Sequence, residues 1–191
     1  MVAGGAAYEA AARVVDPELR VVTIAELGIL REVAADRDRA VVTITPTYSG
    51  CPAMDVIRAD VTRALQDAGW NTVEVVTQLR PPWTTDWIAE SGRAKLTAAG
   101  IAPPALSGAA GIPAGSSAGQ TRGAGAEATD LAPGPAGPVS LGMPGRRDPA
   151  PACPRCGSAQ NEELSRFGST ACKSLWRCGS CREPFEHVKA V

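Results

Sequence analysis

Four cysteines near the end of the chain have the spacing of a tetrahedral metal site. They form two Cys-x-x-Cys pairs, Cys153/Cys156 and Cys178/Cys181, separated by 21 residues. The short turn in each pair lets two thiolates point at one ion while backbone N–H groups face the sulfurs. The interval between the pairs leaves room for a hairpin. We therefore expect residues 152–191 to fold as a zinc ribbon with these four cysteines as ligands of a structural zinc ion.

Two other chemistries are open to these thiols. The pairs would be disulfides in an oxidising compartment, but Met1 to Ala12 lacks the basic start and apolar core of a signal peptide. The same four thiolates also accept a single redox-active iron or a cluster. Cys172 and His187 are nearby in the sequence. Because four thiolates already complete a tetrahedron, we interpret both residues as bystanders.

The composition divides the chain into two modules. Residues 102–151 contain 10 Gly and 9 Pro and no aromatic residue, so they bury too little apolar surface to offset chain entropy. We expect a disordered Gly/Pro/Ala-rich linker there. It separates an N-terminal module, residues 1–101, from the cysteine module, residues 152–191, which is too small to fold without its metal.

Charge and hydropathy argue against two kinds of partner. The chain has 19 Lys and Arg against 20 Asp and Glu, and none of its three segments is strongly basic. Binding to nucleic acid phosphates requires a basic footprint, so we expect no nucleic-acid partner. No apolar run is long enough to span a bilayer. We therefore expect a cytoplasmic protein that does not associate with membranes.

The N-terminal module alternates helix and strand signals. Ala-rich composition, helical spacing of apolar residues and closing glycines predict helices, and alternating β-branched residues predict strands. The helices are expected at 6–15, 52–68 and 85–99, and the strands at 29–34, 40–45 and 72–79. Thr23 and Glu26 have the spacing of a capping box, with Gly28 as the left-handed residue after it. The order α-β-β-α-β-α indicates an α+β fold, a small three-stranded sheet covered by helices.

Cys51 lies in the loop that leads from the second strand into the second helix. The helix dipole and unpaired N–H groups favour negative charge at a helix N-terminus, so we expect a stabilised thiolate. A single thiolate cannot hold a metal alone. Transient metal binding with the ligands of a partner or of a symmetry mate, nucleophilic attack and an inert buried role all remain open. A Cys-His pair would need His187, which lies in the other module.

Two further pairs of side chains are candidate site residues. Asp16 and Glu18 flank a proline in a turn, where they would act as acid/base groups, as ligands of a hard metal, or simply as caps of the turn. Trp83 and Trp87 are four residues apart near a helix start. Indoles in such a place either pack against the sheet or anchor a partner protein, and we expect one ring of each kind.

Several short segments together resemble a known family. Three of them are similar to the small domain of iron-sulfur assembly factors related to SufT and the cytosolic iron-sulfur targeting proteins: DPEL at 16–19, TIAELG at 23–28 and TPTYSGCP at 45–52. Three more segments narrow the resemblance to the PaaD (PaaJ) family of the bacterial phenylacetyl-CoA epoxidase system: PWTTDW at 82–87, FGSTACK at 167–173 and CGSCREPF at 178–185. The chain departs from the pattern in its long linker and in Glu26, where the assembly-factor pattern commonly has Asp.

The resemblance implies a non-catalytic accessory role in the ring epoxidation of phenylacetyl-CoA. That epoxidase uses a carboxylate-bridged di-iron subunit and a reductase with flavin and a [2Fe-2S] cluster, whereas this chain has no Glu-x-x-His pair and no Gly-rich nucleotide loop. It also implies that Cys51, with Asp16 and Glu18 beside it, takes up iron or a cluster transiently. Trp83, Trp87 and the ribbon would then hold the client, which we expect to be the iron-sulfur reductase.

Three alternatives stay open at the level of sequence. The four-cysteine module is also compatible with a rubredoxin-like electron-transfer role, in which it would hold iron in place of zinc. It is equally compatible with a zinc-ribbon adaptor that binds other proteins of the oxygenase complex. A homodimer formed through Cys51 is a further arrangement that the sequence allows.

Overall fold

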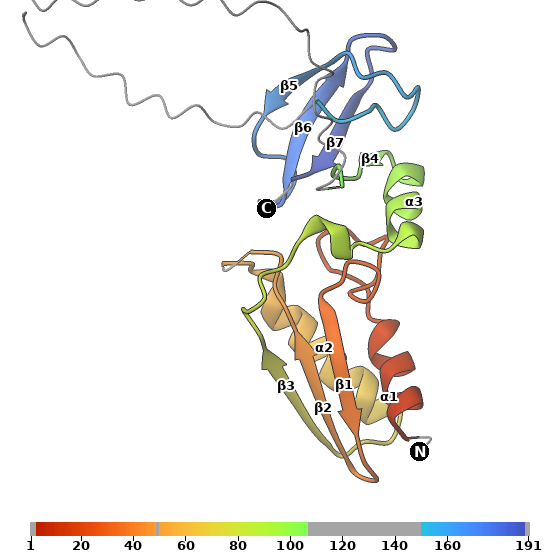
Figure 1. Cartoon of the computed structure of the whole chain (residues 1–191), viewed down its shortest axis with the longest axis vertical. Coiled ribbons are helices and arrows are strands. Elements are labelled where there is room, and N and C mark those ends of the chain that lie inside the picture. The colour runs from red at the N-terminus through yellow and green to blue at the C-terminus, as the bar shows by residue number, and fades with distance from the viewer. Residues whose placement is uncertain (1–2, 49, 107–149, 190–191) are drawn as a thin grey trace, which may run out of the picture.

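The computed structural model describes residues 3–48, 50–106 and 150–189 (Figure 1). The predicted linker, 102–151, lies mostly outside this range, at 107–149. The helices of the described residues are α1 (Ala3–Ala12), α2 (Ala53–Asp67), the 3-10 helix η1 (Thr85–Trp87) and α3 (Glu90–Ala98). The strands are β1 (Leu30–Ala35), β2 (Arg39–Ile44), β3 (Thr72–Thr77), β4 (Ile101–Ala102), β5 (Asn161–Ser165), β6 (Lys173–Cys178) and β7 (Pro184–Val188). None of the helices in these segments is both long and apolar enough to cross a bilayer.

The N-terminal domain has the predicted α+β architecture. Its three-stranded sheet has the order β1-β2-β3, with β1 antiparallel and β3 parallel to β2. Alternation along β2 places Ala40, Val42 and Ile44 in the core. Ile57, Val61 and Leu65, at helical spacing on α2, are fully buried in the same core. The predicted order of elements, α-β-β-α-β-α, is confirmed.

The capping box predicted before the sheet forms as expected. The Thr23 backbone N–H donates to the Glu26 carboxylate at 3.0 Å, and the Glu26 N–H donates to the Thr23 hydroxyl at 3.2 Å. Gly28 follows with φ +72°, and a Cβ built there would lie 2.5 Å from the Cβ of Trp87. The turn therefore sets how closely the tryptophan segment approaches the sheet.

The segment predicted as one helix over 85–99 is interrupted. It forms η1 and then α3, with Ile88 and Ala89 extended between them. The reason is tertiary contact, because the Ala89 N–H donates to the Glu26 carbonyl at 2.8 Å. The capping-box turn thus competes successfully with the local helix propensity of 85–99.

The second sheet has the order β4-β7-β6-β5. Its strand β4 precedes the segment 107–149 in the chain, and the other three strands follow that segment. β4 directly follows α3 and lies beside β7 in Figure 1, and it pairs with β7 in parallel. Each domain also contributes a residue to the core of the other. Ala102 is buried with Cys153, Cys178 and Phe185 of the ribbon, whereas Val188 of β7 is buried in the core of the N-terminal domain. The ribbon is consequently packed against the N-terminal domain.

Candidate functional site

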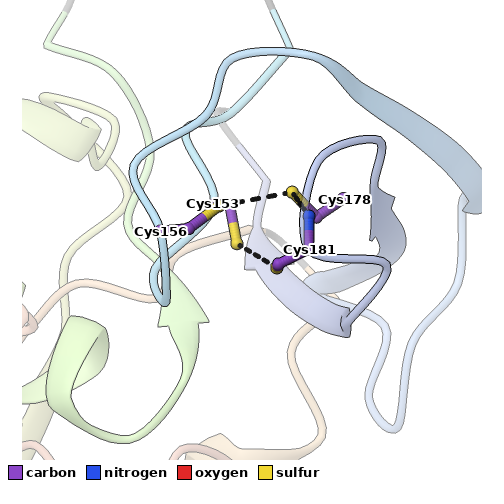
Figure 2. Close-up of side chains that lie close together, drawn as sticks. All are labelled: Cys153, Cys156, Cys178 and Cys181. Carbon is purple, nitrogen blue, oxygen red and sulfur yellow. Dashed lines mark hydrogen bonds between the residues drawn. The ribbon is translucent and has the colours of Figure 1, made fainter.

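The four cysteines of the ribbon converge as the sequence predicts. Their sulfurs lie within 4.8 Å of one another, and Figure 2 shows the two pairs facing each other. The Sγ–Sγ distance is 3.8 Å between Cys153 and Cys181 and 3.5 Å between Cys156 and Cys178. A tetrahedron with metal–sulfur bonds of about 2.3 Å has edges of about 3.8 Å. The donor set and its spacing therefore fit one thiolate-bound metal ion.

The two Cys-x-x-Cys turns have the same backbone geometry. In the first, the Gly157 N–H donates to the Cys153 carbonyl at 2.8 Å, and Gly157 has φ +74°. In the second, the Arg182 N–H donates to the Cys178 carbonyl at 3.1 Å, and Arg182 has φ +64°. A left-handed residue after each pair turns the chain so that both thiols point to the same side.

Backbone N–H groups also face the sulfurs. The Cys181 N–H donates to the Cys178 sulfur at 3.4 Å and, as the largest cause, lowers the pKa of that thiol to about 6. The Glu183 N–H has the same effect on Cys181, but burial and the neighbouring thiols outweigh it and raise the pKa of Cys181 to about 11. Crowded thiols resist joint ionisation without a cation, which is the property expected of a metal site.

A cavity of about 330 Å³ lies between the N-terminal domain and the ribbon. It brings four of the remaining predicted site residues, but not Trp87, together with residues of the ribbon that were not predicted to belong to this site. From the N-terminal domain it is lined by Asp16, Glu18, Leu19, Leu27, Ile29, Thr47, Tyr48, Cys51 and Trp83. From the ribbon it is lined by Ala171, Cys172, Val188 and Lys189.

Asp16 serves two purposes in this cavity wall. Its side chain is buried, and its Oδ1 atom accepts the backbone N–H groups of Glu18 at 2.9 Å and Leu19 at 2.8 Å. Burial raises the pKa of Asp16, although the two hydrogen bonds oppose the shift. Asp16 therefore caps the turn, as one of the sequence interpretations holds, and also presents a carboxyl group to the cavity.

Cys51 is half-buried just before α2, but the expected stabilisation of its thiolate is wrong. Burial is the largest influence and raises the pKa of the thiol, and the carboxylates of Glu18 and Asp16 raise it further. The Ala53 N–H at the start of α2 does lower the pKa, as the helix-terminus argument predicts, but by less. The resting state of Cys51 is accordingly the neutral thiol.

Cys172, which the sequence analysis interpreted as a bystander of the zinc site, lies in this cavity instead. It is half-buried in the ribbon, and its thiol donates to Glu18 Oε2 across the domain boundary at 3.2 Å. Burial raises the pKa of this thiol to about 12, with a further increase from Glu18. Its presence in the segment 167–173, outside both Cys-x-x-Cys pairs, was the available signal. His187 is instead buried in the ribbon, where its Nδ1 lies 3.4 Å from the Ser174 hydroxyl.

The two tryptophans have different environments. Trp83 is 5% exposed, lines the cavity and donates from Nε1 to the Leu27 carbonyl at 2.8 Å. Trp87 is half-buried, and the Arg31 guanidinium lies 3.6 Å from the centre of its ring. Their role in binding a partner stays a prediction.

Comparison with known proteins accounts for both domains. One family model, described as an iron-sulfur cluster assembly protein, matches residues 6–77, and another, the PaaD zinc beta ribbon domain, matches residues 140–189. A subunit of the "Putative 1,2-phenylacetyl-CoA epoxidase" of Escherichia coli K12 is 37% identical over 176 residues, covering 92% of this chain and 86% of that protein. The chain belongs to the PaaD family. The similarity to this PaaD relative extends over the assembly domain as well as the ribbon.

Other relatives share only part of the PaaD arrangement. The Fe-S protein maturation auxiliary factor YitW of Bacillus subtilis 168 is 41% identical over 76 residues, covering 39% of this chain and 74% of that protein. A crystal structure of a domain of unknown function, DUF59, from Bacillus anthracis is 33% identical with a TM-score of 0.45, and it covers 49% of this chain and 90% of that one.

Proposed function

We propose that this chain is a maturation factor that delivers iron or an iron-sulfur cluster to the phenylacetyl-CoA epoxidase complex, with the iron-sulfur reductase as its client. Membership of the PaaD family and the presence of an iron-sulfur assembly domain support an accessory role. The names of two relatives, an epoxidase subunit and an Fe-S maturation factor, support the choice of pathway and cargo.

The observation that carries the proposal is the position of Cys51. Its half-buried thiol lines a cavity beside the carboxyl groups of Asp16 and Glu18. Soft thiolate and harder carboxylate ligands together suit iron. Because the resting thiol is protonated, uptake of iron releases a proton and the reverse step accompanies release of the cargo. Protons therefore compete with the metal for the Cys51 sulfur, which favours exchange of the metal with a client.

The ribbon has a separate role in this proposal. We assign zinc to Cys153, Cys156, Cys178 and Cys181, where it would cross-link the two Cys-x-x-Cys turns and drive folding of the ribbon. The rubredoxin-like alternative is supported by the exposure of Cys156 and Cys181, since an electron-transfer iron needs an accessible edge. Elemental analysis of anaerobically purified protein separates the two: zinc at one per chain without visible colour supports the ribbon, and a coloured, reversibly reducible iron supports electron transfer.

The delivery proposal is tested on the client itself. The reductase is produced with the wild-type chain, with the Cys51→Ser variant and without the chain, and its iron and sulfide contents are measured. Full occupancy is expected with the wild-type chain, and lower occupancy with Cys51→Ser or without the chain. The exposed Glu163→Gln variant serves as a control for expression and should match the wild type. Equal cluster occupancy under all conditions would reject delivery.

A further inference from the structure

The cavity between the domains is lined by a thiol from each of them. Cys51 lines it from the loop just before α2, and Cys172 lines it from the position preceding β6. Both side chains are half-buried, and both contribute to the electrostatic environment of the Tyr48 hydroxyl, which also lines the cavity. The packing of the ribbon thus supplies a second sulfur to a site that has one sulfur in the N-terminal domain.

The ribbon holds Cys172 in place through its own structure. The Cys172 carbonyl accepts the Lys189 N–H at 2.9 Å, and the adjacent Lys173, almost fully buried, pairs with Glu186 at 2.8 Å. On the other side, Cys172 donates to Glu18 Oε2 at 3.2 Å. This is a direct contact between a potential soft ligand of one domain and a potential hard ligand of the other.

The chemical groups around the cavity favour a cation. The described lining residues include two thiols and two carboxyl groups, from Cys51, Cys172, Asp16 and Glu18, but only one cationic side chain, Lys189. Lys173 also acts on Asp16, but it is paired with Glu186. Burying several deprotonated thiols and carboxyl groups together is unfavourable, and a bound metal ion compensates their negative charge.

We propose that Cys51 and Cys172 are the two thiolate ligands of one iron site, with Glu18 as a carboxylate ligand, and that the site exists only while the ribbon is packed on the N-terminal domain. This inference rests on the proposed function and deepens it. The shared chemistry is thiolate–iron bonding, whether the iron arrives as Fe²⁺ or within a cluster. Two thiolates and a carboxylate suit the intermediate softness of iron.

The geometry also explains why such iron would be cargo. In the described residues, the four ribbon cysteines alone bring three or more ligand atoms within 4.8 Å of one another. The cavity residues must therefore move inward to close around an ion. That adjustment lowers affinity relative to a preformed site and permits release to a client.

Binding of Fe²⁺ also has a defined proton balance. Each thiol that forms a sulfur–iron bond loses its S–H proton to solvent, and no electron is transferred in the step. The Cys172 proton already points to Glu18, which accepts it in a hydrogen bond. Two protons should thus be released for each Fe²⁺ bound at neutral pH, and one in a variant that lacks either thiol.

The test uses the full chain with zinc in its ribbon, under anaerobic conditions. One arm adds ferrous ammonium sulfate and the other adds a ferric salt with sodium sulfide, which forms a [2Fe-2S]²⁺ cluster without an added oxidant, so that Fe²⁺ and cluster binding are distinguished. Iron and zinc per chain, the thiolate-to-iron absorption and proton release are measured for the wild type and for Cys51→Ser, Cys172→Ser, Cys172→Ala and Glu18→Gln. The exposed Glu163→Gln variant is the charge-matched control for Glu18→Gln.

Each cavity variant should bind iron at least about tenfold more weakly with zinc retained, since loss of even an outer-shell partner costs about that much. Glu163→Gln should bind as the wild type does. Glu18→Gln lies outside the ribbon and keeps the test valid if a Cys172 variant loses zinc. Wild-type iron binding in Cys172→Ala with loss in Cys51→Ser would overturn this inference and leave delivery by Cys51 intact. Absence of iron binding by the wild type in both arms would also overturn it.

Discussion

Substitution of Asp16 separates its structural role from its charge. In Asp16→Asn the Oδ1 atom still accepts the N–H groups of Glu18 and Leu19, but the ionisable group is gone. In Asp16→Ala both acceptor contacts are lost, and the Leu19 bond is a buried one. The two variants therefore differ in hydrogen bonding while both lack the carboxylate.

The expected magnitudes follow from these contacts. Each lost hydrogen bond costs about 1 kcal/mol, and a buried N–H left without an acceptor costs about 1–3 kcal/mol. We expect Asp16→Ala to lower the free energy of unfolding by about 2–4 kcal/mol. Asp16→Asn should leave it unchanged or raise it at neutral pH, because no buried carboxylate has to be ionised.

The pH dependence has a definite sign. Burial raises the pKa of Asp16 above its usual 3.8, so its proton is held more tightly in the folded state. The resulting stabilisation is fully present below 3.8 and is lost as pH rises through the folded pKa. The stability of Asp16→Asn relative to the wild type should accordingly be greatest near neutral pH and decline as the pH falls toward 3.8.

Urea unfolding at a series of pH values measures these differences. Tryptophan fluorescence follows unfolding, with three of the four tryptophans in the N-terminal domain and Trp176 in the ribbon. Zinc content is checked so that samples with equal ribbon occupancy are compared. A loss in Asp16→Asn as large as in Asp16→Ala would refute the reasoning, because it would show that the charge, and not the hydrogen-bond acceptor, stabilises the turn.

Further predictions concern backbone geometry and metal. Gly28→Ala should lower the free energy of unfolding by about 2–4 kcal/mol, through a left-handed φ and overlap with Trp87, as measured by urea titration; a wild-type midpoint would contradict it. Because the residue after each Cys-x-x-Cys pair has a left-handed φ, Arg182→Gly should strengthen zinc retention against a chelator and Gly157→Ala should weaken it, each by about 1 kcal/mol. The reverse order would contradict the equivalence of the two Cys-x-x-Cys turns. Removal of the metal should expose 150–189 to proteolysis while α1 to β3 stay protected, and continued protection of the ribbon would contradict metal-dependent folding.

Local chemistry explains what was predictable from the sequence. The capping box of Thr23 and Glu26 depends on residues three apart, and the Cys-x-x-Cys turns depend on equally short spacing. Such features are determined by side-chain chemistry and backbone geometry within one turn. The four-cysteine cluster was predictable for the same reason, since each half of it forms locally.

The cavity was not predictable in this way, because it depends on distant pairing. β4 at Ile101–Ala102 meets β7 at Glu186 and His187, and no local pattern indicates that contact. The pairing brings Cys172 to Glu18, whose residue numbers differ by 154. The sign of the pKa shift of Cys51 was missed for a related reason: the helix terminus is visible in the sequence, whereas the burial and the nearby carboxylates result from the fold.

The parallel pairing of β4 with β7 also determines how the chain is held on the two sides of segment 107–149. Ile101 and Ala102 of β4 join the ribbon sheet before this segment begins, and after it the Pro151 carbonyl accepts the side-chain amide of Asn161 at the start of β5. Both sides of 107–149 are therefore attached to one folded unit. The register in which the two domains meet is accordingly set by strand pairing between residues on the two sides of this segment, Ile101–Ala102 before it and Glu186 and His187 after it.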